Sequence, residues 1–147
     1  MAEETIRLAL AGVTWPGRLE MVHEKPLILL DAAHNPHGAR ALASYLRTHH
    51  ADTRKILVFG VMKDKNFASM LAELAPLADE ILLTRPRTDR AALPEELIPF
   101  AGNATVTATI NEALERAREI AREDDLIVIT GSFYTIGEAR TLIDQVI

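Results

Sequence analysis

Short, nearly continuous runs of Leu, Ile and Val alternate along this chain with segments of helical spacing, and this alternation limits the possible folds most strongly. Four of the runs contain few polar residues, as is typical of strands buried on both faces of a parallel sheet. The fifth, A-T-V-T, is less apolar. The runs cover residues 26–31, 55–60, 80–84, 104–107 and 125–130. Strands that alternate with helices indicate βαβ units and a doubly wound parallel sheet.

The segments between these runs place their apolar residues on one face of a helix. Thr109 and Glu112 form a capping box before one of them, and Pro94 is of the type favoured at a first helical position. We expect helices over residues 3–12, 36–49, 67–77 and 110–122, others starting at residue 94 and after residue 130, and a further strand over residues 19–23. The sequence therefore predicts an α/β, Rossmann-like fold of three layers, a mostly parallel twisted sheet of about six strands with helices on both faces.

Composition and charge exclude several classes of function. The 147 residues include no cysteine, which excludes a disulfide framework, a zinc ribbon, an iron–sulfur cluster and a catalytic thiol. The net charge is −5 without a basic stripe, which argues against binding to nucleic acid. The apolar stretches are far shorter than the ~20 residues that cross a membrane, and the acidic start is unlike a signal peptide. We expect a cytoplasmic protein with a small-molecule or protein partner.

Polar residues follow the first buried run, where open α/β sheets bind their ligands. Asp31 ends that run, and its carboxylate is suited to accept hydrogen bonds from ribose hydroxyls. His34 lies in the next loop and could donate to a phosphate or a carboxylate. Asn35 and Pro36 are explained by a helix start alone. A solvated strand end and a surface histidine are the ordinary alternatives for Asp31 and His34.

Three further candidates lie in other loops. Gly131 and Ser132 open the last helix, where Ser132 either caps the helix or binds an anion at its positive end. Lys65 belongs to a charged loop after the second run and could be an ordinary turn residue. Arg18 follows a Pro-Gly pair, so a rather fixed backbone presents a guanidinium suited to bidentate contact with phosphate.

Several motifs of self-contained enzymes are missing from the sequence. It contains neither the G-x-x-x-x-G-K-[ST] phosphate loop nor a G-x-G-x-x-G after the first strand. It also lacks the G-x-S-x-G elbow of hydrolases and the H-E-x-x-H of zinc proteases. Each remaining candidate could therefore be one contact of a nucleotide-binding site, and the candidates do not form a complete set of catalytic residues.

Four motifs in order identify a family. W-P-G-R-L-E, L-L-D-A-A-H-N-P-H-G-A-R, L-V-F-G-V-M-K-D-K and V-I-T-G-S-F-Y together resemble the carboxy-terminal domain of folylpolyglutamate synthase and bifunctional dihydrofolate synthase, which belong to the Mur ligase superfamily. The resemblance covers nearly the whole chain. It departs from the usual pattern at Ala32, where the family has glycine, and at Asn66, where it often has aspartate.

The resemblance implies an ATP-dependent ligase that adds glutamate to folates, and also to dihydropteroate in some members. In such enzymes an amino-terminal P-loop domain holds ATP, Mg²⁺ and the folate, whose carboxylate is phosphorylated and then attacked by the amine of glutamate. By resemblance, Arg18 contacts the ATP phosphates and Asp31 the ribose, with Lys65 as an additional contact. His34 and Ser132 serve the glutamate side and the reaction centre, and no residue of this chain is assigned to the metal.

The same resemblance divides the chain into residues 1–14, the end of an interdomain helix and linker, and residues 15–147, the carboxy-terminal domain. Its partner is the enzyme's own P-loop domain, which is absent from these 147 residues, so we expect the chain alone to be inactive. Two alternatives remain at this point: the corresponding domain of a murein peptide ligase, or a non-catalytic flavodoxin-like binding module. A P-loop domain encoded directly upstream would decide between enzyme and module.

Overall fold

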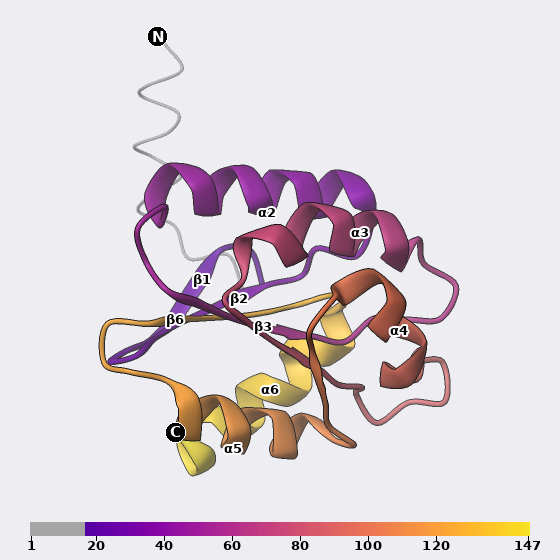
Figure 1. Cartoon of the computed structure of the whole chain (residues 1–147). Coiled ribbons are helices and arrows are strands. Elements are labelled where there is room, and N and C mark those ends of the chain that lie inside the picture. The colour runs from indigo at the N-terminus through magenta and orange to yellow at the C-terminus, as the bar shows by residue number, and fades with distance from the viewer. Residues whose placement is uncertain (1–16) are drawn as a thin grey trace, which may run out of the picture.

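A computed structural model describes residues 17–147 of the chain. The predicted helix over residues 3–12 and the linker assigned to residues 1–14 lie outside the described residues. The described part contains one six-stranded sheet with the order β1-β2-β6-β3-β4-β5. Its strands are β1 (Glu20–Glu24), β2 (Leu27–Asp31), β3 (Lys55–Phe59), β4 (Glu80–Leu83), β5 (Thr105–Val106) and β6 (Leu126–Thr130) (Figure 1). Only β1 pairs antiparallel, with β2, and the other neighbours are parallel.

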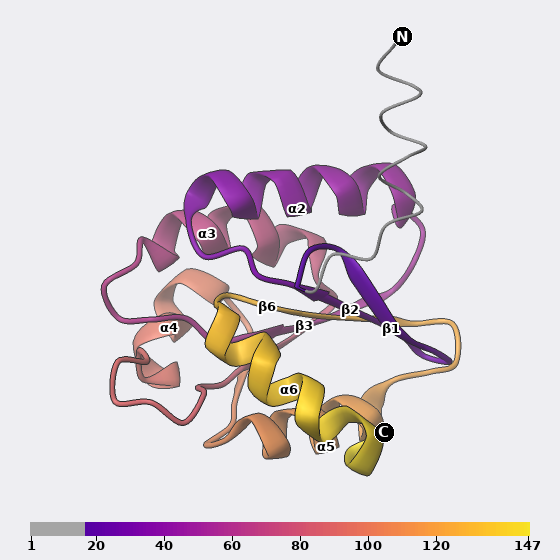
Figure 2. The ribbon, with the colours of Figure 1, turned by 180° about the vertical axis from the view of Figure 1, so that it is seen from behind.

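Helices cover both faces of this sheet, which confirms the three-layer prediction. One face carries α2 (Pro36–His49), α3 (Phe67–Leu74), the 3₁₀ helix η1 (Ala75–Leu77) and α4 (Pro94–Ala101). The other face carries α5 (Ile110–Ile120) and α6 (Phe133–Val146), which lie side by side in Figures 1 and 2. Each crossover joins parallel strands through a helix, as the alternation of apolar runs and helical segments predicts.

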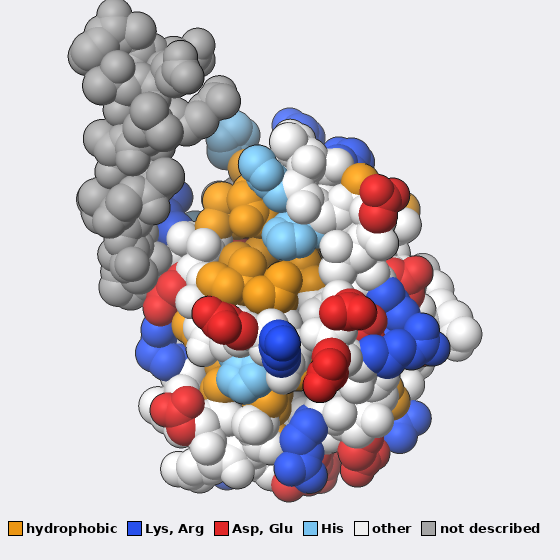
Figure 3. Space-filling model, turned by 90° about the vertical axis from the view of Figure 1, so that its left-hand side faces the viewer, with side chains coloured by type: hydrophobic (Ala, Val, Ile, Leu, Met, Phe, Trp, Pro, Cys, Tyr) orange, Lys and Arg blue, Asp and Glu red, His pale blue; other side chains and the backbone are white. Residues whose placement is uncertain are grey.

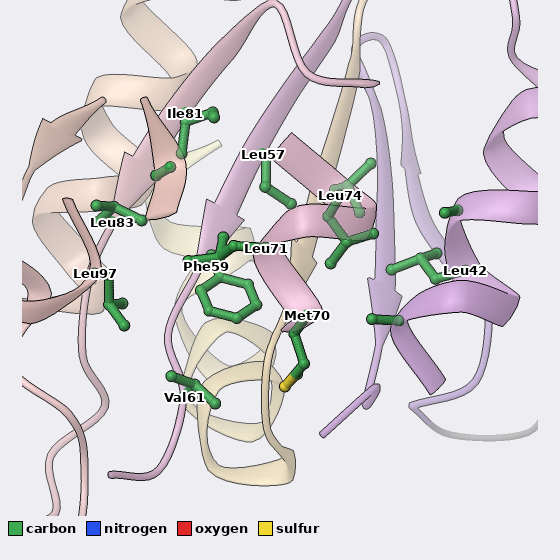
Figure 4. Close-up of a cluster of buried hydrophobic side chains, with 14 of the residues drawn as sticks. Leu42, Leu57, Phe59, Val61, Met70, Leu71, Leu74, Ile81, Leu83 and Leu97 are labelled. Carbon is green, nitrogen blue, oxygen red and sulfur yellow. The ribbon is translucent and has the colours of Figure 1, made fainter. Parts of the chain in front are cut away.

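Two apolar cores result, one on each side of the sheet. Successive side chains of a strand point to opposite faces, so Leu29, Leu57 and Val128 enter the core under α2 and α3, and Ile28 and Ile127 enter the core under α5 and α6. Figure 4 shows the first core, where the side chains of β3 and β4 meet those of α3 and α4. Because both faces are covered, apolar residues occupy nearly every position of the central strands.

Two predicted elements differ in the structure. The helix expected over residues 67–77 ends as α3 at Leu74 and continues only as η1. Pro76 explains the end, because it has no N–H to bond the carbonyl four residues earlier and its ring collides with that carbonyl. The strand expected over residues 104–107 shrinks to β5, whose Thr105 is exposed. It is an edge strand beside β4 alone, in agreement with its less apolar sequence.

Charged side chains link the amino-terminal ends of the parallel strands, on the side of the molecule that Figure 3 shows. Asp125, only 3% exposed, forms an ion pair with Arg54 and accepts the backbone N–H of Arg122 at 2.8 Å. The Arg54 guanidinium also lies 3.6 Å from Glu80. These contacts link the starts of β3, β4 and β6. Figure 3 shows charged side chains of both signs around a small apolar patch with histidines.

At the opposite edge, the loops that follow β3 and β6 lie in direct contact. Gly60 donates its N–H to Thr130 O at 3.2 Å. Gly131 has φ +119°, and a Cβ at this position would lie 2.1 Å from Gly60 O. Only glycine allows both this backbone conformation and this approach. The two loops can therefore occupy the same edge of the sheet only because residue 131 has no side chain.

This contact predicts a large loss of stability for Gly131→Ala. Gly102, at φ +76°, is a matched control, since a Cβ there would meet nothing within 4 Å. Gly102→Ala measures the cost of a positive φ alone, and we expect Gly131→Ala to lower the free energy of unfolding by at least ~2 kcal/mol more. Denaturant unfolding of both variants measures the difference. Equal losses would show that the loops separate without cost.

Candidate functional site

A pocket of about 310 Å³ opens at the carboxyl end of β2. Its walls are the turn formed by residues 17–19, the loop that leads from β2 to α2, the first turns of α2, and Phe133 at the start of α6. Arg18, Asp31 and His34 all line it. This is the edge at which open α/β sheets bind ligands. The structure thus brings three of the five predicted site residues to one cavity.

The turn that carries Arg18 has an unusual backbone. Gly17 and Leu19, on either side of Arg18, both have positive φ, +78° and +46°. The φ of +78° favours glycine at residue 17, and a Cβ there would lie 2.7 Å from Ile136 Cδ1, so that this side chain would have to shift. Gly17 O accepts the N–H of Ala32 at 2.6 Å. The turn thus packs against α6 and bonds to the loop after β2, and it holds the exposed Arg18 at the margin of the pocket.

Asp31 already accepts two backbone hydrogen bonds. Its Oδ1 takes the N–H of Leu19 at 3.0 Å, and its Oδ2 takes the N–H of Ala33 at 3.1 Å. Burial raises the pKa of this carboxyl above its ordinary value, and the two N–H groups and the charge of Arg18 oppose that rise. A carboxylate offers about four lone-pair sites, so Asp31 retains acceptor capacity toward the pocket while it fastens the turn to the loop.

His34 is oriented by a carbonyl of its own loop. Its Nδ1 lies 3.0 Å from Ala32 O, and because a carbonyl can only accept, Nδ1 carries the proton. Nε2 is left for a ligand, as an acceptor when the ring is neutral and as a donor when it is charged. The imidazole also lies 5.7 Å from the ring of Phe133 at an angle of 41°. These two contacts orient the imidazole.

Ser132 directly precedes Phe133, at the amino-terminal end of α6. It is 3% exposed and caps α6, where its Oγ accepts the N–H of Thr135 at 3.0 Å. Its hydroxyl donates to Thr135 Oγ1 at 2.9 Å, and Thr135 Oγ1 in turn donates to Gly60 O at 2.7 Å. Because a carbonyl only accepts, this chain has one direction, and Ser132 keeps one lone pair for a further N–H donor.

Lys65 lies in a different loop from these residues. It belongs to the loop after β3, where its N–H bonds Met62 O at 3.2 Å and its carbonyl accepts the N–H of Phe67 at 2.9 Å. It is not among the residues that line the pocket. Its role as an additional ATP contact stays a prediction.

Two lining residues were missed by sequence reasoning. His37 lies in the first turn of α2, and Phe133 directly follows the cap of α6 with 56% of its surface exposed. The signal for His37 was its position three residues after His34, across a helix start. The signal for Phe133 was an aromatic residue directly after a predicted helix cap.

Within residues 17–147, no three His, Asp or Glu side chains are grouped so as to hold a metal ion. In the same part of the chain, every helix is too short or too polar to span a bilayer.

Comparison with known protein families identifies the family to which this chain belongs. The family described as "Mur ligase, glutamate ligase domain" matches residues 17–133, which is more than half of the chain. The chain belongs to this family. The sequence resemblance to Mur ligases is thereby confirmed, and the alternative of a non-catalytic flavodoxin-like module is not supported.

Relatives of this Mur ligase domain are named as folate enzymes. The Escherichia coli (strain K12) dihydrofolate synthase/folylpolyglutamate synthase is 31% identical over 144 residues, which cover 98% of this chain and 34% of that protein. The structure of E. coli FolC in complex with DHPP and ADP superposes with a TM-score of 0.87 at 30% identity, and covers 99% of this chain and 35% of that one. The chain therefore spans about a third of the length of these relatives.

A second related structure contains more ligands. It is a bifunctional folylpolyglutamate synthase/dihydrofolate synthase with Mn, AMPPNP and L-glutamate bound, with a TM-score of 0.82 and 31% identity over 99% of this chain and 35% of that one. Solved relatives of this domain thus bind ADP or an ATP analogue, and one of them binds a divalent metal and glutamate.

The raised pKa of Asp31 predicts a pH-dependent contribution to stability. Folding favours the protonated carboxyl, so between the ordinary pKa of 3.8 and the higher pKa in the fold the native state binds more protons than the unfolded state. This group therefore lowers the free energy of unfolding as pH rises through that window, and its effect is constant above it. Asp31→Asn should lose this slope, which unfolding measured at a series of pH values detects. A slope that is unchanged or reversed would contradict the prediction.

Proposed function

We propose that this domain forms one wall of the active site of an ATP-dependent ligase that joins L-glutamate to a folate carboxylate through an acyl phosphate. We propose in addition that the enzyme accepts dihydropteroate in place of the folate. The observation that carries the proposal is the convergence of Arg18, Asp31 and His34 on one pocket at the carboxyl edge of the sheet. The names of the relatives favour folate over a murein peptide as the acceptor. We propose a cytoplasmic location for this reaction.

Arg18 and Asp31 form the nucleotide side of the proposed site. A guanidinium at the margin of the pocket can bind two phosphate oxygens at once, and it stabilises the charge that develops when the phosphoryl group is transferred. The carboxylate of Asp31 has acceptor sites left for ribose hydroxyls after its two backbone bonds. We assign Arg18 to the phosphates and Asp31 to the ribose, with Lys65 as a further phosphate contact from the loop after β3.

His34 and Ser132 form the glutamate side. The free Nε2 of His34 can donate to a carboxylate of glutamate or accept a proton from its amine. Ser132 can only accept, because its own proton is committed to Thr135. That polarity suits an N–H donor such as the amine that attacks the acyl phosphate. Both residues are next to Phe133: the His34 ring lies 5.7 Å from its ring, and Ser132 directly precedes it in the chain.

ATP-dependent ligation also needs a phosphate loop and a divalent cation. The sequence contains no G-x-x-x-x-G-K-[ST] motif, and the relatives are about three times as long as this chain. We propose that a P-loop domain of the same enzyme supplies the phosphate loop and holds Mg²⁺, whose charge would offset that of the phosphates. Closure of the two domains would bring Arg18 to the nucleotide.

The first functional prediction concerns the 147-residue chain alone. Incubated with ATP, Mg²⁺, L-glutamate and a folate, it should form no ADP above a blank without protein, because it has no phosphate loop. A coupled assay for ADP measures this. Steady turnover by the purified chain would overturn the proposal that a second domain completes the site.

The second prediction separates the two sides of the site in the assembled enzyme. Arg18→Ala should lower kcat/KM for ATP by roughly 30- to 1,000-fold, about 2–4 kcal/mol of transition-state stabilisation, with little change in the KM for glutamate. His34→Ala should instead raise the KM for glutamate or slow consumption of the acyl phosphate. Arg116→Ala, in an exposed ion pair on α5, is the control.

Ser132→Ala distinguishes a cap from a substrate contact. Loss of the cap alone lowers the free energy of unfolding by about 1 kcal/mol and leaves kinetics unchanged. A substrate contact predicts in addition a higher KM for glutamate. Steady-state kinetics and thermal unfolding of the same preparation measure both effects. A variant that melts early with normal kinetics would remove Ser132 from the site.

A further inference from the structure

Glu20 makes contacts that the proposed site does not use. It is the first residue of β1, and its carboxylate binds Arg140 of α6 through two hydrogen bonds, Oε1 to Nη2 at 2.6 Å and Oε2 to Nη1 at 2.7 Å. Oε1 also accepts the backbone N–H of Gly17 at 2.9 Å. The side chain of Glu20 is only 11% exposed, whereas that of Arg140 is 40% exposed. One carboxylate thus joins α6 to the turn that carries Arg18.

That turn needs external support because its backbone is unfavourable. Leu19 has φ +46°, a region that L-residues with a side chain rarely occupy. Such conformations persist only where surrounding contacts hold them. Three hydrogen bonds do so here. Ala32 N–H and the Asp31 carboxylate bind the turn to the end of β2, and Glu20 binds it through Gly17 to α6.

We infer that Glu20 is a positioning residue, which together with Arg140 fixes the direction in which the Arg18 guanidinium enters the pocket. The inference rests on the proposed function in one respect, the assignment of Arg18 to the phosphates of ATP. Glu20 itself touches no substrate. Its effect is transmitted through the Gly17 N–H, which holds in place the residue directly before Arg18.

An ordinary ion pair would not explain this arrangement. A partly exposed pair of side chains adds little to stability, and it needs no third partner. Here Arg140 engages both oxygens of Glu20 and so holds the carboxylate in the orientation that the Gly17 N–H requires. The bidentate contact with Arg140 also lowers the pKa of Glu20 below its ordinary value. Phe133, which lines the pocket, begins the same helix that carries Arg140.

The test is a double-mutant cycle in the assembled enzyme with Glu20→Met and Arg18→Ala. Glu20→Met removes the acceptor and keeps the bulk of the side chain. We expect the KM for ATP to rise about tenfold or more, with the KM for glutamate changed by less than about twofold. Added to Arg18→Ala, it should have no further effect on ATP kinetics, because no guanidinium remains to be positioned. Arg140→Met leaves the Glu20 carboxylate in place but no longer fixes its orientation, so it should raise the KM for ATP by less.

Two outcomes would overturn the inference. If the effects of Glu20→Met and Arg18→Ala on ATP kinetics multiply, Glu20 acts on the enzyme by another route. If Arg140→Met and Glu20→Met lower the thermal midpoint equally and leave the KM for ATP unchanged, the pair is only structural. Arg116→Met, which breaks an exposed ion pair within α5, is the matched control and should change neither quantity.

Hydrogen exchange of the Gly17 amide provides a readout that does not depend on the proposed function. Glu20→Met should accelerate its exchange about tenfold or more, and Arg116→Met should not. Unchanged exchange would overturn the inference whatever the kinetics show. If Arg18→Ala leaves the KM for ATP unchanged, the assignment of Arg18 to ATP fails, and the exchange rate still decides whether Glu20 holds the turn.

Discussion

Burial of the central strands on both faces is the constraint on which the rest of this structure depends. Strands β2, β6 and β3 are apolar at nearly every position, so each needs helices on both sides. Parallel strands must be joined by crossovers, and these crossovers supply the helices. All loops that leave the strands at their carboxyl ends then gather at one edge. The pocket lies there because the polar groups of those loops have no place in either core.

Polar contacts at that edge tie the loops into one unit. Gly131 allows the loop after β6 to touch the loop after β3, and the chain of hydroxyls from Ser132 through Thr135 to Gly60 O adds hydrogen bonds between the same two loops. Asp31 and Glu20 fasten the turn of Arg18 to β2 and to α6. The same groups therefore serve stability and placement of the site. A carboxylate such as Asp31 can do both because its two oxygens accept more than two hydrogen bonds.

Most elements were predictable because local patterns and tertiary burial agree. The capping box at Thr109 begins α5, and the run at residues 125–130 forms the fully buried β6. The prediction was wrong where a local signal outweighed the average pattern. Pro76 ends α3 within an otherwise helical sequence. The strand expected over residues 104–107 is only two residues long, because as the last strand of the sheet β5 has one neighbour and needs few apolar residues.

The sequence by itself determined the fold class, the family and the identity of Arg18, Asp31 and His34 as candidates, because periodicity and motif spacing are properties of a linear chain. Only the tertiary structure decided which candidates meet. It brought residues 18, 31 and 34 to one pocket, put Ser132 into a buried chain of hydroxyls, and left Lys65 outside the pocket. The contact of Glu20 with Arg140 joins residues 120 positions apart. No local pattern encodes such a contact, because it depends on how β1 and α6 pack against the same sheet.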